Sequence, residues 1–488
     1  MVRPVLIGTL VVLFCSVSGV WCLFGSRIVA PNITDAIIAS AKYSSGWTYD
    51  PHNSITKRET AVDSSGTLGT LFAMTKSISD PMMLMIDTIY RGASDKRMKM
   101  DRWFGFIYNF IKQSIDGVEE ANSTMENLKN NTKPYLYNNL KRDLTSLNKI
   151  AMIDLIKGLR MFYIEIKEMN STEYHPHSNN ITINITERVV CGVTSPLKSA
   201  NTYMSSITST ISAIASDRRQ IISYHAKLNE TMNVAIRQIA KAFISLNRTV
   251  VQAQHEVQEN ITLTFDVFNQ SHGFILEQAN YFGNDNSSLL SVPSTMAIER
   301  ENLSKFIDNS TKFCMDQVTK SLHGQTLLVT NQLISAMNNV TNQFAVSSHF
   351  DIGSCTQDAV QQLIDSAKHV NRMGSCVDSE LESFRKTSTV VHKQLWNTIG
   401  SIAFATMDLL PVSCAKKTGQ CIDINYFSNN ITHHARSRMT SGVEQFIDDE
   451  RAISDRIVDC VKRIGRTTEL YAREINNKFQ GCLGEQVK

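Results

Sequence analysis

Cysteine is the residue type in this sequence whose spacing points most clearly to chemistry. The 488 residues include ten cysteines. Two of them lie in an N-terminal segment that we expect to be removed, which leaves an even set of eight. In an exported chain such a set predicts disulfides. No Cys-x-x-Cys motif occurs, so neither a zinc ribbon nor a dithiol redox site is indicated. The eight are Cys191, Cys314, Cys355, Cys376, Cys414, Cys421, Cys460 and Cys482.

The other reactive side chains form no catalytic motif. The sequence contains no G-x-S-x-G, H-E-x-x-H, P-loop or G-x-G-x-x-G pattern. The pairs His175/His177 and His433/His434 could each touch a metal, but neither has a Cys or carboxylate at ligand spacing. The acidic run 448–450 is interpreted as a solvated helix face, because a calcium loop needs a glycine turn. We therefore expect no enzyme activity, no cofactor and no metal site.

The first 22 residues predict a secretory signal peptide. Arg3 precedes an apolar run from Val5 to Cys15, and cleavage is expected after Cys22. The alternative, a short N-terminal anchor, needs a longer apolar run than this one. The net charge is +3, which gives no reason to expect a nucleic-acid partner. We expect a secreted chain with no stable membrane anchor.

Asn-x-Ser/Thr triplets are unusually frequent. Chance placement of the asparagines, serines and threonines would give about six or seven, and fifteen occur. Each used acceptor must face solvent, because the glycan is bulky and hydrophilic. We expect glycosylation at Asn32, Asn122, Asn130, Asn170, Asn180, Asn184, Asn229, Asn247, Asn260, Asn269, Asn286, Asn302, Asn309, Asn339 and Asn430.

A long apolar seam with alternating spacings of three and four indicates a helix in the central part of the chain. Sustained over about seven heptads, this period is typical of a coiled coil, although a long helix of an ordinary bundle would also show it. If free, the seam would support a homo-oligomer. Arg218 and His225 interrupt it, and His225 is either a pH-sensitive layer or a tolerated core residue. The seam comprises Ile207, Ile211, Ile214, Ile221, Leu228, Met232, Ala235, Ile239, Ala242, Leu246, Val250, Ala253 and Val257.

Two further helical tracts carry four of the cysteines. One tract holds Cys355 and Cys376, which are 21 residues apart, and the other holds Cys460 and Cys482, which are 22 apart. Each span is about 32–33 Å on a helix, so two antiparallel helices would align the four sulfurs. We therefore predict the pairs Cys355–Cys482 and Cys376–Cys460. The remaining predictions are a small loop closed by Cys414–Cys421 and a bridge Cys191–Cys314 between the ends of the central region.

The N-terminal third shows weaker patterns. Residues 23 to about 66 are expected to be irregular. The aromatic stretch Met100–Ile115 follows a basic run and could be a membrane-surface helix, but we favour a buried core helix. Overall we expect an all-α, elongated helical bundle or coiled-coil-like protein, stapled by disulfides at its C-terminal end. The predicted regions are a signal at 1–22, an N-terminal helical region at 23–190, a glycosylated long-helix region at 191–350 and a disulfide-rich region at 351–488.

The last region resembles the TsetseEP domain of secreted insect proteins. The resemblance rests on Cys355 and Cys376, the close pair Cys414 and Cys421, and the ending in which Cys482 follows Cys460. It covers about a quarter of the chain. It implies a helical, extracellular domain to which no activity is generally assigned.

These patterns together predict a structural or interaction role outside the cell. The partner would be an extracellular protein, a glycan or a second copy of the chain. One alternative is a carrier that holds an apolar ligand within a helical bundle, for which the run Met82-Met83-Leu84-Met85 is a weak indication. Another is an adhesin-like binding protein.

Overall fold

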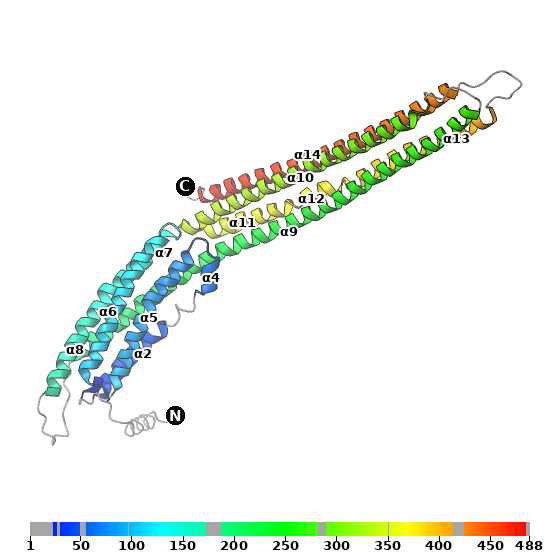
Figure 1. The fold of residues 1–488 in the computed structure, drawn as a ribbon. Coiled ribbons are helices and arrows are strands. Elements are labelled where there is room, and N and C mark those ends of the chain that lie inside the picture. Colours follow the sequence, from blue (N-terminus) through cyan, green and yellow to red (C-terminus); the bar gives the residue numbers. More distant parts are fainter. Residues whose placement is uncertain are drawn as a thin grey trace, which may run out of the picture. The chain divides into compact units, whose positions relative to one another are not determined.

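The computed structural model confirms the predicted all-α class. It describes residues 23–26, 30–48, 55–95, 97–171, 187–281, 289–349, 351–412 and 424–484, and these contain helices but no strand (Figure 1). None of the helices in these ranges combines the length and hydropathy that a membrane span requires. The chain divides into two compact units, each built from separate stretches of sequence.

Unit 1 comprises residues 1–224 and 341–354. Within it, α5 packs against both α2 and α6. The sequence predicted an irregular segment from residue 23 to about 66. This prediction is wrong, because two helices, α2 and α4, form within that segment. α4 begins with a capping box, in which Thr56 and Glu59 each satisfy the other's backbone N–H. The helices are η1 (Leu23–Gly25), α2 (Pro31–Thr48), α4 (Lys57–Val62), α5 (Thr67–Ser94), α6 (Met100–Thr124), η2 (Met125–Leu128), α7 (Pro134–Ser146), η3 (Leu147–Met152), α8 (Ile153–Ser171) and the start of α9 (Glu187–Tyr281).

A proline inside α5 explains how closely α5 and α6 approach. Pro81 has no N–H, so the carbonyl of Ser77, four residues earlier, loses its helical donor. Gly117 of α6 lies against that carbonyl, and a Cβ there would be 2.0 Å from the Ser77 oxygen. Only a glycine allows the two backbones to meet at this point.

The same arrangement recurs between α8 and α9. Pro196 lies inside α9, four residues after Gly192, and so removes the donor for the Gly192 carbonyl. Gly158 of α8 approaches that carbonyl, and a Cβ on Gly158 would lie 1.7 Å from its oxygen. Twice in unit 1, a glycine therefore packs against the carbonyl that a helical proline has released.

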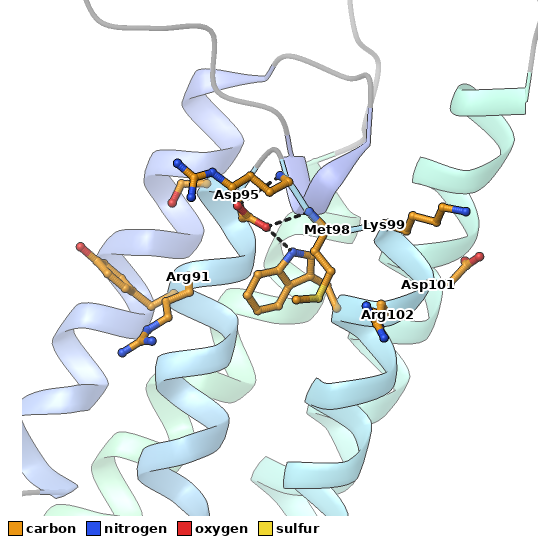
Figure 2. Close-up of a pocket in the computed structure, with 10 residues that line it drawn as sticks. Arg91, Asp95, Met98, Lys99, Asp101 and Arg102 are labelled. Carbon is orange, nitrogen blue, oxygen red and sulfur yellow. Dashed lines mark hydrogen bonds between the residues drawn. The ribbon is translucent and has the colours of Figure 1, made fainter.

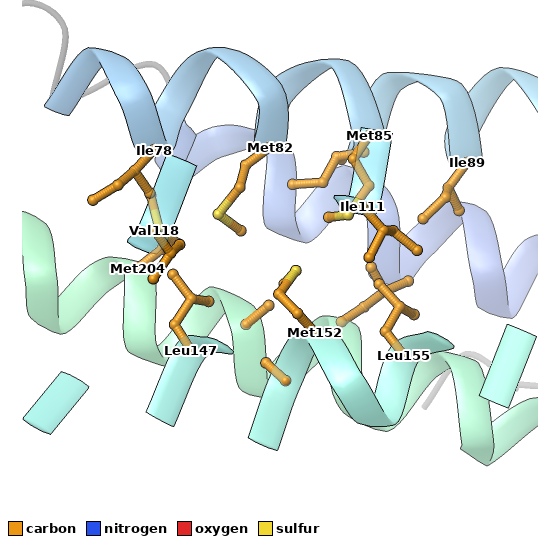
Figure 3. Close-up of a cluster of buried hydrophobic side chains, with 14 of the residues drawn as sticks. Ile78, Met82, Met85, Ile89, Ile111, Val118, Leu147, Met152, Leu155 and Met204 are labelled. Carbon is orange, nitrogen blue, oxygen red and sulfur yellow. The ribbon is translucent and has the colours of Figure 1, made fainter. Parts of the chain in front are cut away.

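The core of unit 1 is built from aliphatic, methionine and aromatic side chains. Met82 and Met85 of α5 point into it, together with residues from α6 and from the η3–α8 segment, such as Ile111 and Leu155 (Figure 3). All of these side chains are buried. The methionine run that suggested an apolar carrier thus contributes to an ordinary core, while Leu84 within the same run is exposed.

Unit 2 comprises residues 225–340 and 355–488. The rest of α9 contacts α10, α12 and α13 in this unit, for example where Ser388 of α13 donates to Glu256 of α9. Every residue of the predicted central seam is buried, which confirms the periodicity and favours a bundle helix. The seam is filled by the chain's own helices and is not a free surface for self-association. The other helices are α10 (Val292–Val346), α11 (Ile352–His369), α12 (Arg372–Asp378), α13 (Leu381–Val412) and α14 (Ile424–Gly484).

Two disulfides join α11 and α12 to α14, as predicted. Cys355 bonds Cys482 with the Cα atoms 6.2 Å apart, and Cys376 bonds Cys460 with the Cα atoms 5.9 Å apart. Along α14, buried residues recur every eleven positions, at Met439, Glu450, Val461 and Ala472.

Two other predictions from the sequence are wrong. Cys191 and Cys314 do not bond: Cys191 is an exposed thiol of unit 1, whereas Cys314 is a buried thiol of unit 2. The predicted central region 191–350 is not a separate domain, because α9 and α10 both contribute residues to each unit. Cys414, Cys421 and the signal segment lie outside the described residues.

Candidate functional site

An open pocket of about 1260 Å³ lies in unit 1, at the turn that joins α5 to α6. We call it the corner pocket. Its lining combines four basic side chains with two acidic and two aromatic ones, and Figure 2 shows them around the turn. The lining residues are Tyr90, Arg91, Ser94, Asp95, Arg97, Met98, Lys99, Asp101, Arg102 and Trp103.

Asp95 fixes the conformation of the turn. Its carboxylate accepts the backbone N–H groups of Arg97 and Met98 at 3.2 and 3.1 Å and the Trp103 indole N–H at 3.0 Å (Figure 2). Burial by itself would raise the pKa of Asp95, but these three donors outweigh it and hold the pKa below its usual value. The Asp95 carboxylate therefore stabilises the turn that lines the pocket.

A cluster of buried aromatic side chains packs against the residues that flank the turn. Phe24 packs on Phe104 and Phe162, with ring centroids 5.2 and 5.8 Å away. Gly25 has a φ of +72°, and a Cβ there would collide with the carbonyl of Met98. The aromatic segment of α6 is therefore part of the core, as favoured from the sequence.

The acidic side chains of the corner pocket are already engaged, whereas most of the basic ones are not. Tyr163 donates its hydroxyl to Asp101 at 2.7 Å, and Arg91 pairs with Asp87 at 2.9 Å. Lys99 and Arg102 are exposed at the rim (Figure 2), and Arg97, which also lines the pocket, is exposed as well. A group of exposed cations that line one pocket is suited to anionic groups that are presented at a surface.

A second polar cluster lies inside unit 2, around Glu450. The sequence suggested a solvated face for this acidic run, which is wrong for Glu450: the residue is 0% exposed. The hydroxyl of Thr311 donates to its carboxylate at 2.8 Å, while its other oxygen is buried without a hydrogen bond. Burial raises the pKa of Glu450 to about 7. The eleven-residue recurrence of buried positions on α14 was the signal that could have revealed this placement.

The free thiol Cys314 lies in the same cluster. Burial, followed by the nearby charge of Glu450, raises its pKa to about 11. Its backbone carbonyl accepts the Ser454 hydroxyl at 3.3 Å. A buried thiol with so high a pKa is unreactive, so the cluster has no nucleophile.

The predicted glycan acceptors differ in accessibility. Asn260 is only 6% exposed, donates to the Glu256 carbonyl and has its Oδ1 atom 2.8 Å from His392 Nδ1, so its side chain is not presented to solvent in this fold. Asn269 and Asn339 are half-buried. The side chains of Asn170, Asn180, Asn184 and Asn286 lie outside the described set. The exposed acceptors are Asn32, Asn122, Asn130, Asn229, Asn247, Asn302, Asn309 and Asn430.

The histidine pairs do not form a metal centre in the part of the chain that the structure describes. His433 is exposed and His434 is half-buried on α14, while His175 and His177 fall outside the described ranges. No three His, Cys, Asp or Glu side chains gather there in a way that could hold a metal ion.

Taken together, these features define an all-α protein whose described residues include a disulfide-bonded helical bundle and a pocket lined by basic side chains. A comparison with protein families and with curated proteins finds no match to this chain.

Proposed function

We propose that this chain is a secreted, N-glycosylated interaction protein and that it binds an anionic extracellular glycan through the corner pocket. The observation that carries the proposal is the pocket itself, where Arg97, Lys99 and Arg102 stand exposed while Asp95 and Asp101 are engaged by donors of their own. Binding rather than turnover is proposed, because both carboxylates of the pocket accept hydrogen bonds from Trp103 or Tyr163, and neither is hydrogen-bonded to Ser94 or Lys99.

Three features support the extracellular part of the proposal. The first 22 residues have the composition of a signal peptide. Two disulfides join the helices of unit 2, which is compatible with an oxidising compartment. Eight of the asparagines in glycosylation triplets are exposed. The resemblance of the C-terminal region to the TsetseEP domain agrees with this location.

The test is binding of the secreted, oxidised chain to an immobilised sulfated polysaccharide over a range of salt concentrations. The variant Arg97→Ser/Lys99→Ser/Arg102→Ser removes three exposed charges. Affinity should fall by about tenfold, since each exposed ion contact contributes about 0.5 kcal/mol. The affinity of this variant should also depend less steeply on salt concentration than the affinity of the parent chain does.

The matched control removes three exposed lysines of unit 1 that lie away from the pocket. This variant, Lys112→Gln/Lys129→Gln/Lys149→Gln, changes the net charge by the same amount. It should retain most of the affinity. An equal loss in both triple variants would mean that only net charge matters, and the corner pocket would then not be the site.

A further inference from the structure

Large apolar side chains stay exposed along one face of α10, in unit 2. Phe306 and Phe313 are 47% and 56% exposed, and Ile298 is exposed beyond them. The spacings along 298, 302, 306, 309 and 313 are four, four, three and four residues, so all five lie on one face. The two remaining positions on that face are the glycan acceptors Asn302 and Asn309, both exposed.

The same combination recurs on two other helices of unit 2. On α9, the acceptor Asn247 lies three residues after Ile244 and four before Val251, and both of these apolar side chains are more than half exposed. On α14, Asn430 follows Tyr426, which is 70% exposed, by four residues. Exposed acceptors and exposed apolar side chains therefore share helix faces, one turn apart.

We infer that the glycans on Asn247, Asn302, Asn309 and Asn430 cover these apolar side chains and keep unit 2 soluble. Residues one helical turn apart have Cβ atoms about 5–6 Å from each other, so the first sugar of each chain reaches its apolar neighbours. The C–H groups of that sugar pack against a phenyl or aliphatic surface, while its hydroxyl groups face water. Without such a cover, contiguous exposed apolar surface favours association.

A second copy of the chain is a poorer occupant for this face. Asn302 and Asn309 stand between the apolar side chains, so glycans there would hold another helix away from Phe306. The inference rests on the proposed secreted glycoprotein, and it adds a role for specific glycans.

The test compares secreted, full-length variants that lack chosen glycans. Asn302→Gln/Asn309→Gln should bind several-fold more of a hydrophobic dye and should aggregate at lower protein concentration. Adding Phe306→Ser and Phe313→Ser to that variant should restore the behaviour of the parent chain. The control is Asn229→Gln, which removes an exposed acceptor of α9 with no large, exposed apolar side chain one turn away.

The design changes the asparagine of the triplet and leaves its hydroxyl residue intact. Thr311 completes the triplet of Asn309, but its hydroxyl donates to the buried Glu450. A change at Thr311 would therefore disturb the core as well as the glycan.

The outcomes separate the inference from the proposed function. Glycopeptide mass spectrometry is done first. A secreted chain with no sugar on any of its asparagines would overturn both the glycoprotein proposal and this inference. Glycans at Asn302 and Asn309 whose loss has no more effect than that at Asn229 would overturn the inference alone. A discrete dimer formed by the double variant would overturn it too, because the face would then be a subunit interface.

Discussion

The two units treat a buried carboxylate in opposite ways. In unit 1, Asp63 is buried, but it accepts hydrogen bonds from the Leu68 N–H at 2.7 Å and the Arg218 guanidinium at 2.6 Å. Burial would raise the pKa of Asp63, yet these donors lower it. In unit 2, Glu450 has one hydroxyl donor, and burial raises its pKa to about 7. Both carboxyl groups are buried, so the hydrogen-bond donors around each one, and not the extent of its burial, decide whether its ionised form is favoured.

The contrast extends to how the units are held together. Both units have cores of aliphatic, aromatic and methionine side chains, but the interior of unit 2 also contains His272, whose two ring nitrogens are buried and without hydrogen bonds. Burial lowers the pKa of His272, so it is held neutral. Unit 2 in turn has two disulfides, which disfavour its unfolded state.

The largest effect should come from opening the inner disulfide of unit 2. Replacing Cys376 and Cys460 by serine releases residues separated by 84 positions, and loop entropy predicts a loss of about 4 kcal/mol in the free energy of unfolding. Denaturant unfolding followed by circular dichroism measures it. The control is Cys191→Ser, at an exposed free thiol, which should leave stability unchanged. A loss below about 1 kcal/mol would mean that packing alone holds unit 2.

Removing the cation beside Asp63 should cost about 3 kcal/mol, because it leaves a buried acid without its charge partner. The variant is Arg218→Met. Arg219→Met is the matched control: this neighbouring arginine pairs with Glu59 at 2.8 Å, but both side chains are partly exposed, so the loss should be under about 1 kcal/mol. Urea unfolding measures both losses. Equal losses would contradict the claim that the buried Asp63 depends more on its arginine partner than the partly exposed Glu59 does.

The next largest loss of stability should come from adding a methyl group where α5 and α6 meet. Gly117→Ala places a methyl group against the Ser77 carbonyl, and overpacking of this kind costs about 2–3 kcal/mol. Gly105→Ala, on the same helix but with open space around it, should instead stabilise unit 1 by about 0.5–1 kcal/mol. Thermal unfolding of the two variants should therefore shift in opposite directions.

The smallest effect is the pH dependence that Glu450 gives to unit 2. Its folded pKa of about 7 lies above the ordinary 4.5, so the folded state keeps the proton between these pH values and unfolding releases it. Stability should thus fall as the pH rises from 4.5 to 7 and remain reduced above it.

Glu450→Gln should remove this dependence. We expect it to be about 1–3 kcal/mol more stable than the parent chain at pH 8 and to show no gain at pH 4. The exposed neighbour Asp448, changed to Asn, serves as the control. Parallel stability curves for Glu450→Gln and the parent chain between pH 4 and 8 would show that the carboxyl is ionised in the fold.

Local periodicity predicted more of this structure than side-chain chemistry did. The spacing of Cys355, Cys376, Cys460 and Cys482 predicted both disulfides, because helix geometry fixes the distance between residues of known separation. The burial of Glu450 was missed, since a run of acids is usually solvated and the recurrence of Met439, Val461 and Ala472 at steps of eleven from it was not used.

The pairing of prolines with glycines could not be read from the sequence either. Pro196 and Gly158 lie 38 positions apart, and nothing in their spacing indicates that the carbonyl released by the proline meets the glycine. In the region of the corner pocket, the sequence indicated only a basic run that precedes an aromatic helix. The sequence did not show that Asp95 accepts three hydrogen bonds from the turn itself, because those donors are known only from the fold.

The outer disulfide has a mechanical consequence. Because Cys355 is bonded to Cys482, tension applied between the two ends of the chain passes through the sulfur bridge and bypasses the 127 positions between them. About 430 Å of extended contour length is thereby withheld from stretching until both this bond and the inner Cys376–Cys460 bond are reduced. A reductant would therefore increase the length to which this chain can be stretched under load.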